Sequence, residues 1–343
     1  MEFRTELYIN QNISADFPQI NHKMPILSIG SCFAGMIGAK LAFYKFKVIS
    51  NPFGIIFNPI SINKLLILSL ENTFNDVLNN NFIKNQENIW YHYDFHSDLY
   101  GNSKEEIKEK INIKIKETKS FFNDNSEKTL ILTFGTAFVY VQNQNNEIVA
   151  DCHKIPQKNF TKKMLSVEEI VADFDEIYPK LLQKNTQIIL TVSPVRHIKD
   201  TLVLNSVSKS ILRVAAHILS EKYEKVYYFP SFELMNDDLR DYRFYKPDML
   251  HPTAQAEDYI WQKFVQACMN APTQAIMQVW EDLYKNISHK NQKENSNNIS
   301  QEKSEKHNQF LQKTLFELEN LAQTLAGEID LKEEIEKLRN RLK

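Results

Sequence analysis

The sequence has few cysteines and few glycines, and each shortage excludes some classes of protein. Its three cysteines (Cys32, Cys152 and Cys268) are scattered over 343 residues without a CxxC pair. This argues against a disulfide framework and a thiolate zinc site, and it favours a reducing compartment. Histidines and carboxylates form no cluster at metal-ligand spacing, so we expect neither a metal nor another cofactor.

A strong charge imbalance and long apolar runs are also lacking. The formal net charge is −2, which gives no reason to expect a nucleic acid as partner. The first residues contain no apolar signal segment, and we expect no later run long enough to span a bilayer. These absences predict a cytoplasmic protein with no membrane partner. Hydrophobic residues make up 43% of the chain, enough for one large domain with an appendage.

Apolar runs suited to strands alternate with stretches suited to helices over most of the chain. A possible edge strand at Glu6–Ile9 comes first, and 138–150 has the pattern of an inserted hairpin. The main strands are expected at 25–29, 47–50, 129–134, 188–192 and 225–229. Strands separated by helices indicate βαβ units, so we predict an α/β domain over 1–285 with a mainly parallel sheet of about five strands.

The composition changes after residue 285. Residues 286–308 are polar and contain no Phe, Trp or Tyr, which predicts a linker. In 309–343, leucines recur at alternating spacings of four and three, as in a coiled coil. We therefore predict a helical tail that makes a homo-oligomer; the alternative is a helix docked on the domain.

The turn after the first strand is the first candidate for chemistry. Gly30-Ser31-Cys32 joins the strand 25–29 to a helix that starts near Ala34. A serine there stands at the carboxyl edge of a sheet, beside unpaired helix amides that favour an anion. Ser31 is therefore a candidate nucleophile, although a helix N-cap is an equally ordinary role. Cys32 is a rival nucleophile, and its backbone amide is a candidate oxyanion donor.

A second candidate lies near the end of the domain, at Asp248-x-x-His251. A hydroxyl nucleophile needs a base to take its proton and a third group to orient that base. Three residues of separation let a carboxylate and an imidazole converge at one tight turn. Asp248 and His251 could therefore complete a triad with Ser31, although a structural His–Asp pair has the same pattern.

Together these motifs resemble a known family. Gly30-Ser31-Cys32-Phe33-Ala34 is similar to the motif of the GSCFA family, and the Gly-Ser turn with a late Asp-x-x-His resembles the SGNH, or GDSL-like, hydrolase superfamily. Other similar stretches are 51–54, 134–137, 152–154, 193–197 and 248–252. The resemblance covers about residues 20–270. It implies a three-layer α/β/α sandwich with about five parallel strands, and a hydrolase or acyltransferase acting on a small-molecule or glycan ester through Ser31, Asp248 and His251.

The sequence departs from the superfamily pattern in two places. The usual acidic residue between the first glycine and serine is absent, and the block that normally supplies an asparagine reads Gly135-Thr136-Ala137. We therefore expect the oxyanion donors to be the backbone amides of Ser31 or Cys32 and of Gly54, with a side-chain donor from Thr136 or Asn58.

Four further residues are candidates for substrate binding. Arg196 and His197 follow a strand at its carboxyl end, where a guanidinium could hold an anion; an ion pair with the acidic stretch 237–241 is equally plausible. His153 and Lys154 could line the same cleft, although a loop histidine fixed by hydrogen bonds fits as well. An enzyme is the favoured interpretation, and the alternative is a non-catalytic binding or scaffold protein.

Overall fold

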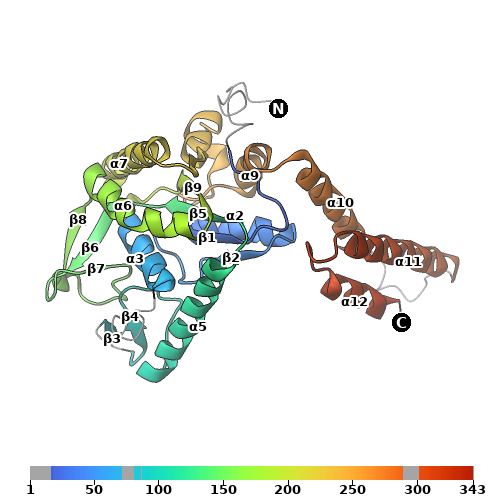
Figure 1. The fold of residues 1–343 in the computed structure, drawn as a ribbon, viewed down its shortest axis with the longest axis horizontal. Helices are drawn as coiled ribbons and strands as arrows, with labels where there is room; N and C mark the ends of the chain where they lie inside the picture. The colour runs from blue at the N-terminus through green and yellow to red at the C-terminus, as the bar shows by residue number, and fades with distance from the viewer. Residues whose placement is uncertain (1–16, 72–80, 86, 289–300, 343) are drawn as a thin grey trace.

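The computed structural model describes residues 17–71, 81–85, 87–288 and 301–342, without the side chains of 301–307. Its centre is a five-stranded parallel sheet with the strand order β10-β9-β5-β1-β2 (Figure 1). The strands are β1 (Ile26–Gly30), β2 (Val48–Ser50), β5 (Lys128–Phe134), β9 (Thr186–Val192) and β10 (Val226–Tyr228). All five lie where the sequence predicts them, so the α/β class and the parallel sheet are confirmed. The expected edge strand at Glu6–Ile9 lies outside the described residues.

Helices cover both faces of the sheet because its central strands are apolar on both sides. On β1, Leu27 and Ile29 face one core and Ile26 faces the other. The first core is covered by α3 (Pro59–Leu70), α5 (Lys104–Asn123), α6 (Val167–Gln183) and α7 (Thr201–Lys222). The second is covered by α2 (Cys32–Phe43) and α9 (Ala254–Cys268).

Two small antiparallel sheets lie beside the carboxyl end of the main sheet. The predicted hairpin is present as β6 (Phe138–Gln142) and β7 (Ile148–Val149), and β8 (Phe160–Met164) adds a strand that the sequence did not predict. Three of the five β8 residues are exposed, so the strand carries a weak apolar signal. The second sheet pairs β3 (Phe82–Lys84) with β4 (Trp90–His92).

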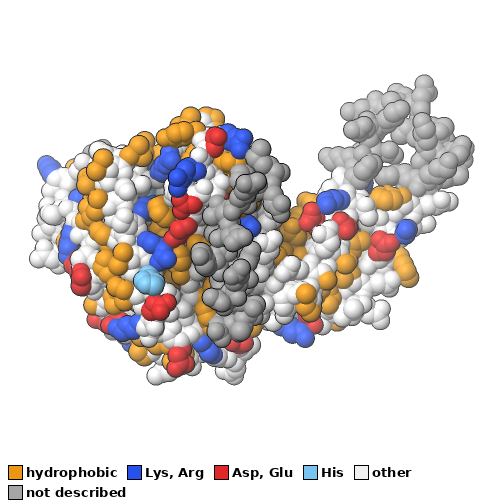
Figure 2. All heavy atoms as spheres, turned by 90° about the horizontal axis from the view of Figure 1, so that it is seen from above, with side chains coloured by type: hydrophobic (Ala, Val, Ile, Leu, Met, Phe, Trp, Pro, Cys, Tyr) orange, Lys and Arg blue, Asp and Glu red, His pale blue; other side chains and the backbone are white. Residues whose placement is uncertain are grey.

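Short helices and turns complete the body of the molecule. They are η1 (Gln157–Asn159), η2 (Ile198–Asp200), α8 (Ser231–Glu233), the π-helix η3 (Leu234–Asp238) and η4 (Tyr242–Phe244). The surface carries both signs of charge: Figure 2 shows one face on which acidic and basic side chains are interspersed.

The tail differs from the sequence prediction. After α9 the chain continues as α10 (Ala271–Ser288), and the tail forms α11 (Gln301–Thr324) and α12 (Lys332–Arg341), so both ends of the predicted linker are helical. Leu318 and Leu331 pack with Trp280 and Leu283 of α10, and Phe43 of α2 packs against this cluster. The leucine stripe is thus at least partly buried within the chain. This is the docked alternative, because α10 offers an apolar face that the sequence analysis had counted as part of the domain.

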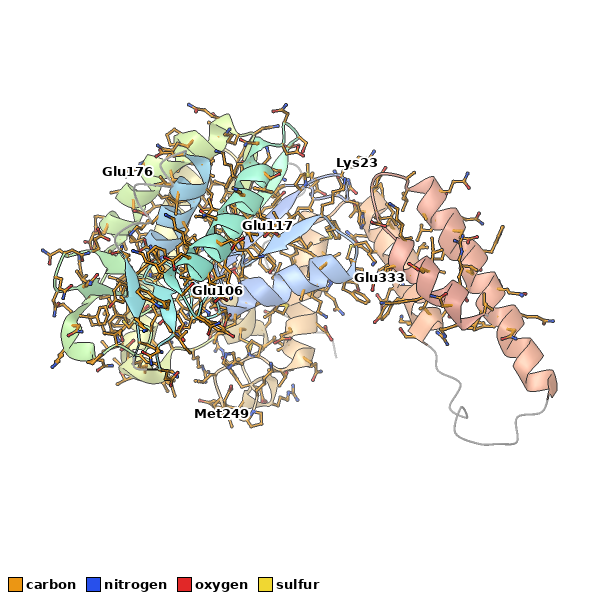
Figure 3. The ribbon with its side chains drawn as sticks, turned by 90° about the horizontal axis from the view of Figure 1, so that it is seen from below. Lys23, Glu106, Glu117, Glu176, Met249 and Glu333 are labelled. Carbon is orange, nitrogen blue, oxygen red and sulfur yellow. The ribbon has the colours of Figure 1, made fainter. Side chains whose placement is uncertain are left out.

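Polar contacts also join the tail to the body. Lys23 pairs with Glu328 at 3.0 Å, and Lys47 Nζ donates to the Gly327 carbonyl at 3.0 Å. Lys45 pairs with Glu334, and its ammonium lies 4.9 Å from the centre of the Trp280 ring. Figure 3 shows Lys23 and Glu333 near this junction of body and tail.

One helix passes a membrane-span criterion that the sequence analysis expected no segment to meet. Ile198–Lys222, which contains α7, is long and apolar enough to cross a bilayer by length and composition alone. A core helix of a soluble protein passes the same test, and α7 packs Leu212, Ala215, Ala216 and Leu219 into the first core.

Candidate active site

The turn after β1 is fixed by its backbone. Gly30 has φ +146°, and a Cβ there would lie 2.1 Å from the Thr133 carbonyl oxygen of β5, so only glycine fits. The Gly30 amide donates to Asn51 Oδ1 at 2.9 Å, and the Ser31 amide donates to the Thr133 oxygen at 3.2 Å. These contacts hold the start of α2 at the carboxyl edge of the sheet.

Ser31 is the N-cap of α2, the ordinary role that the sequence analysis left open. Its hydroxyl accepts a hydrogen bond from the Phe33 amide at 3.3 Å, and the residue is 0% exposed. An N-cap must turn its oxygen toward the helix axis to reach that amide. The side chain is therefore committed to the helix and shielded from solvent.

Asp248 and His251 form the expected pair. Asp248 Oδ2 accepts from His251 Nδ1 at 2.7 Å, and Asp248 Oδ1 accepts from the backbone amides of Leu250 and His251 at 2.8 and 3.0 Å. The His251 amide, followed by that of Leu250 and the His251 ring, lowers the pKa of Asp248 to about 2. The ionised carboxylate therefore fixes the proton of His251 on Nδ1 and leaves Nε2 free to accept a proton.

The imidazole faces Cys32. His251 Nε2 lies 4.0 Å from Cys32 Sγ, the outer limit for a hydrogen bond to sulfur. Cys32 is the first residue of α2 and is only partly buried, whereas Ser31 is fully buried. The structure thus brings together His251, Asp248 and Cys32, with Ser31 behind them as a cap. The geometry favours the rival nucleophile over the predicted one.

A buried lysine lies under this site. Lys209 of α7 is 1% exposed, and its ammonium donates to the carbonyls of Gly135 and Ser193 at 2.7 Å each. Burial lowers the pKa of Lys209 to about 7. Burial also raises the pKa of the Cys32 thiol, whereas its own amide, Lys209 and Lys246 act to lower it. The resting thiol is therefore protonated, and it needs a base to become a nucleophile.

Two of the predicted oxyanion donors are engaged elsewhere. The amides of Ser31 and Gly54 donate to the carbonyls of Thr133 and Asn51. Asn58 Oδ1 caps α3 by accepting from the Ser61 amide at 2.8 Å, a contact that does not use the Nδ2 donor of the same side chain. The Cys32 amide remains, because the first amides of a helix have no helical acceptor.

Thr136 and His197 lie on the wall of a neighbouring cavity. The Thr136 hydroxyl lies 3.1 Å from Ser208 Oγ of α7. The His197 ring packs edge-on against Phe57, with 5.0 Å between ring centres. Burial, followed by Lys209 and His251, lowers the pKa of His197 to about 4, so its imidazole is neutral near pH 7. Both residues line a cavity of about 470 Å³, which Lys154 also borders.

The other two predicted substrate residues have different places. Arg196 stacks its guanidinium on Tyr245, 4.0 Å from the ring centre, and donates to the Met249 carbonyl at 3.4 Å. The alternative, an ion pair with 237–241, is absent among the described residues. Asp237 and Asp241 pair with Arg240 and Arg243, and Asp238 accepts from Tyr259. His153 is 2% exposed and is held by the His92 carbonyl and Ser97, which is the fixed loop role left open above.

Comparison with known proteins places the chain. A model of the GSCFA family matches residues 25–264. The chain belongs to the GSCFA family. No curated protein and no solved structure matched it. The matched region of this GSCFA protein holds the turn after β1, Lys209 and the Asp248–His251 pair, and it ends within α9. The helices α10 to α12 lie beyond it.

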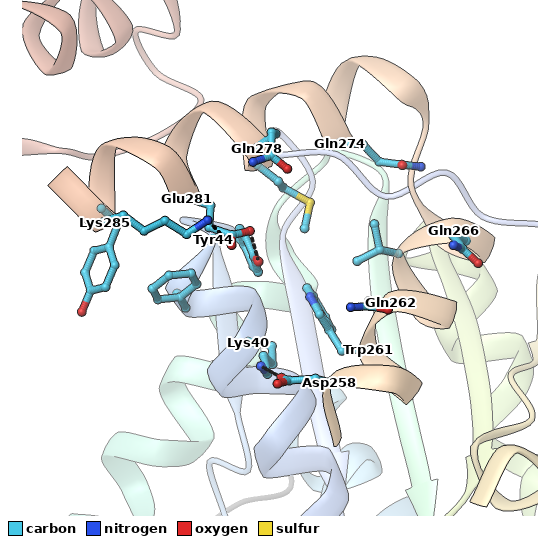
Figure 4. A pocket seen from close by; sticks show the side chains of 14 residues that line it. Lys40, Tyr44, Asp258, Trp261, Gln262, Gln266, Gln274, Gln278, Glu281 and Lys285 are labelled. Atoms are coloured by element: carbon cyan, nitrogen blue, oxygen red, sulfur yellow. Dashed lines mark hydrogen bonds and ion pairs between the residues drawn. The ribbon is translucent and has the colours of Figure 1, made fainter. Parts of the chain in front are cut away.

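A second cavity of this GSCFA protein lies at the opposite end of α2. It measures about 610 Å³ and lies between α2, α9 and α10 (Figure 4). Its polar groups pair with each other: Tyr44 donates to Glu281 at 3.1 Å, and Lys40 pairs with Asp258. Within the described ranges, no group of three or more His, Cys, Asp or Glu side chains could hold a metal ion.

Sequence reasoning missed two residues of the site, Lys209 and Asn51. Lys209 shares the buried face of α7 with Ser208 and Leu212. A lysine on an otherwise apolar helical face is the signal that could have identified it. Asn51 orients the turn through the Gly30 amide, and its position before a proline marked only a turn.

Proposed function

We propose that this protein is an esterase or O-acyltransferase in which Cys32 is the nucleophile, His251 the general base and Asp248 the group that orients the base. The observation that carries the proposal is the imidazole of His251, bound to Asp248 at 2.7 Å and facing Cys32 Sγ at 4.0 Å. The distance must shorten in a complex with substrate, as is common for catalytic hydrogen bonds.

The motif around Cys32 supports membership of the SGNH superfamily and its three-layer α/β/α architecture. If the superfamily's Gly-acid-Ser is laid residue by residue on Gly30-Ser31-Cys32, the cysteine takes the place of the catalytic serine. Ser31 then stands where the acidic residue is usual. The parallel sheet, the position of the turn after β1 and the late Asp-x-x-His are consistent with this placement.

In the proposed reaction, Cys32 Sγ attacks the ester carbonyl carbon as the thiol proton passes to His251 Nε2. The Cys32 amide donates to the oxyanion of the tetrahedral intermediate. When the intermediate collapses, the C–O bond breaks and His251 returns the proton to the leaving alcohol, which leaves a thioester on Cys32. Neutral His251 then deprotonates water or a second alcohol, whose attack releases the acyl group and restores the thiol. A free thiol needs a reducing compartment, so the protein is proposed to act in the cytoplasm.

Single substitutions test the nucleophile. With p-nitrophenyl acetate, Cys32→Ala should abolish turnover, and iodoacetamide should inactivate the wild type by alkylating Cys32. Ser31→Ala should retain turnover but lose about 1 kcal/mol of stability, the usual contribution of an N-cap. Asp248→Asn should lower kcat because the His251 tautomer is no longer fixed.

The opposite pattern would restore the prediction from the sequence. Loss of turnover in Ser31→Ala alone, with fluorophosphonate labelling of Ser31, would indicate an acyl-Ser31 intermediate. If neither residue is labelled and no ester is hydrolysed, the non-catalytic binding or scaffold protein becomes the better interpretation.

A further inference from the structure

We propose that the 470 Å³ cavity beside the triad binds a negatively charged group of the substrate, so that the preferred substrate is an anionic ester. This inference rests on the proposed function, because it assigns the substrate class of the same site. The volume lies within the range of small-molecule sites.

One residue of the cavity wall, His197, lies near His251 of the triad. The Phe57 carbonyl accepts from the amides of Gly135 and Thr136 at 2.7 and 3.1 Å, and the Phe57 ring packs against His197. His197 in turn is close enough to His251 for the charge of one to lower the pKa of the other. A ligand in this cavity that extends past His197 would therefore approach the reacting ester.

Two lysines at its border have no carboxylate partner among the described residues. Lys154 lies on a turn in which it and His153 both have positive φ, 61° and 49°. Lys199, in η2, has its ammonium 5.4 Å from the centre of the Tyr140 ring. Lys154 and Lys199 are both exposed, so neither ammonium needs an anion to offset the cost of burial.

The remaining charges of the cavity lining are one ion pair and one hydrogen-bonded carboxylate. Lys162 pairs with Asp200, and Asp151 accepts from Ser97 Oγ at 2.6 Å and from the His153 amide at 2.9 Å. Three lysines against two aspartates leave the cavity lining with a net charge of +1. Cys152 also lines the cavity, but burial and then Asp151 raise its pKa to about 11. Its thiol is therefore a weak nucleophile near neutral pH.

Aromatic side chains supply the rest of the wall. Phe57, Phe138 and Tyr140 line the cavity, and Lys162 lies 4.4 Å from the centre of the Phe138 ring. Apolar rings with cations at the border suit a substrate that has a flat or aliphatic body and one negative charge. Arg196 does not line this cavity, so the anion-binding role expected for it passes to Lys154 and Lys199.

Matched ester pairs test the proposal. One pair places the charge on the alcohol (4-acetoxybenzoate against its methyl ester), and the other places it on the acyl group (mono-p-nitrophenyl glutarate against p-nitrophenyl butyrate). For at least one pair, the ratio of kcat/KM for the anionic ester to that for the neutral one should fall about tenfold or more in Lys154→Gln/Lys199→Gln, as expected for lost hydrogen bonds to a charged group. Comparing ratios between variants cancels the intrinsic reactivity of each ester.

Lys108→Gln/Lys116→Gln on α5 is the control, because it removes the same charge from residues that line none of the cavities described above. Its ratios should equal those of the wild type. Equal ratios in all three proteins would overturn the charge preference while leaving the esterase intact.

Binding separates this proposal from the proposed function. Cys32→Ala should bind the glutarate or benzoate ester in calorimetric titration, and adding the two cavity substitutions should abolish that binding. Binding without turnover in the wild type would overturn the esterase and support the anion site. Absence of both binding and turnover would overturn both proposals.

Discussion

At the scale of single residues, Lys209 is the most unusual feature of the site. Its side chain joins Gly135 and Ser193, which follow β5 and β9, and its charge acts to lower the pKa of the Cys32 thiol. Among the described residues, no carboxylate forms an ion pair with it. If Lys209 had only a structural role, an apolar side chain could fill its place without the cost of burying an amine. We therefore interpret Lys209 as a positioning residue for the proposed nucleophile.

Lys209→Met should therefore move the pH dependence of Cys32 alkylation. While Lys209 is protonated, its charge favours the thiolate of Cys32. The variant should therefore be alkylated more slowly than the wild type below about pH 7, and the two rates should converge at higher pH, where Lys209 is neutral. The measurement is the alkylation rate between pH 6 and 10, with circular dichroism as the check on folding. If Lys209→Met does not fold, Cys32 alkylation in the wild type still tests the coupling, because its profile should contain a second inflection near the pKa of Lys209. A single inflection in a folded variant and in the wild type alike would show that Lys209 only ties the two strands together.

Arg196 contacts the turn that carries Asp248 and His251. Its amide donates to the Leu250 carbonyl at 3.3 Å and its guanidinium to that of Met249, whose φ is +59°. Figure 3 shows Met249 on the body of the molecule, away from the tail. Arg196→Ala should lower kcat by a similar factor for anionic and neutral esters, because it loosens the Asp248–His251 turn. Arg196→Lys should rescue little, since stacking on Tyr245 needs the flat guanidinium. A loss confined to anionic esters would instead make Arg196 an anion-binding residue.

At the scale of helices, the tail contributes stability to the domain. Ending the chain at Ser288 would uncover Trp280 and Leu283, which are 2% and 5% exposed. Burial of each is worth about 2 kcal/mol, so the melting temperature should fall by roughly 10 °C. Esterase activity should persist, because every residue proposed for the site lies before α9. Calorimetry and the ester assay check the two parts; an unchanged melting temperature would mean that the tail does not pack on α10.

The pattern of leucines in the tail also predicts self-association, and this stays a prediction. Phe316 of α11 is 64% exposed and is available to a second chain, even though Leu318 is covered. Light scattering should give the full-length protein a molar mass at least twice that of its own chain, and the protein that ends at Ser288 the mass of a single chain. Phe316→Ser, which leaves the internal packing unchanged, should reduce that particle to a monomer. A monomer in every case would confine the stripe to its internal role.

At the scale of the whole molecule, buried histidines predict sensitivity to acid. Burial, followed by nearby cations, lowers the pKa of His92 to about 3 and that of His197 to about 4, from 6.5. Between these values and 6.5 the unfolded chain binds protons that the folded chain does not, so the free energy of unfolding falls as the pH falls. For His197 the loss amounts to about 2–3 kcal/mol by pH 4. Asp248, with its pKa lowered to about 2, adds a loss only below its ordinary value of 3.8.

Urea unfolding at pH 7 and pH 4.5 measures this effect. His197→Gln should show a smaller loss of stability between the two pH values than the wild type. His217→Gln is the control, because His217 of α7 is exposed. An equal loss in all three proteins would mean that His197 is protonated in the folded state.

Local patterns in the sequence were enough for much of the fold. Each strand of the main sheet is a short apolar run between turn residues, and such runs carry their own signal. The Asp248–His251 pair is also local, because three residues of one turn set its geometry. Ser166 with Glu169 likewise forms the capping box that their spacing predicts.

The tertiary structure decided what depends on the direction of side chains and on distant segments. Ser31 and Cys32 are neighbours in sequence, and only the position of His251, more than two hundred residues later, selects between their side chains. Lys209 reaches the site because α7 crosses beneath two strand ends. The leucine stripe suits packing against a second chain or against α10 equally well. An apolar helical face must be covered, but its pattern does not identify the surface that covers it. The sequence therefore determined the elements and the local pair, and packing between distant elements determined which side chain faces His251, where the cavity lies and where the tail packs.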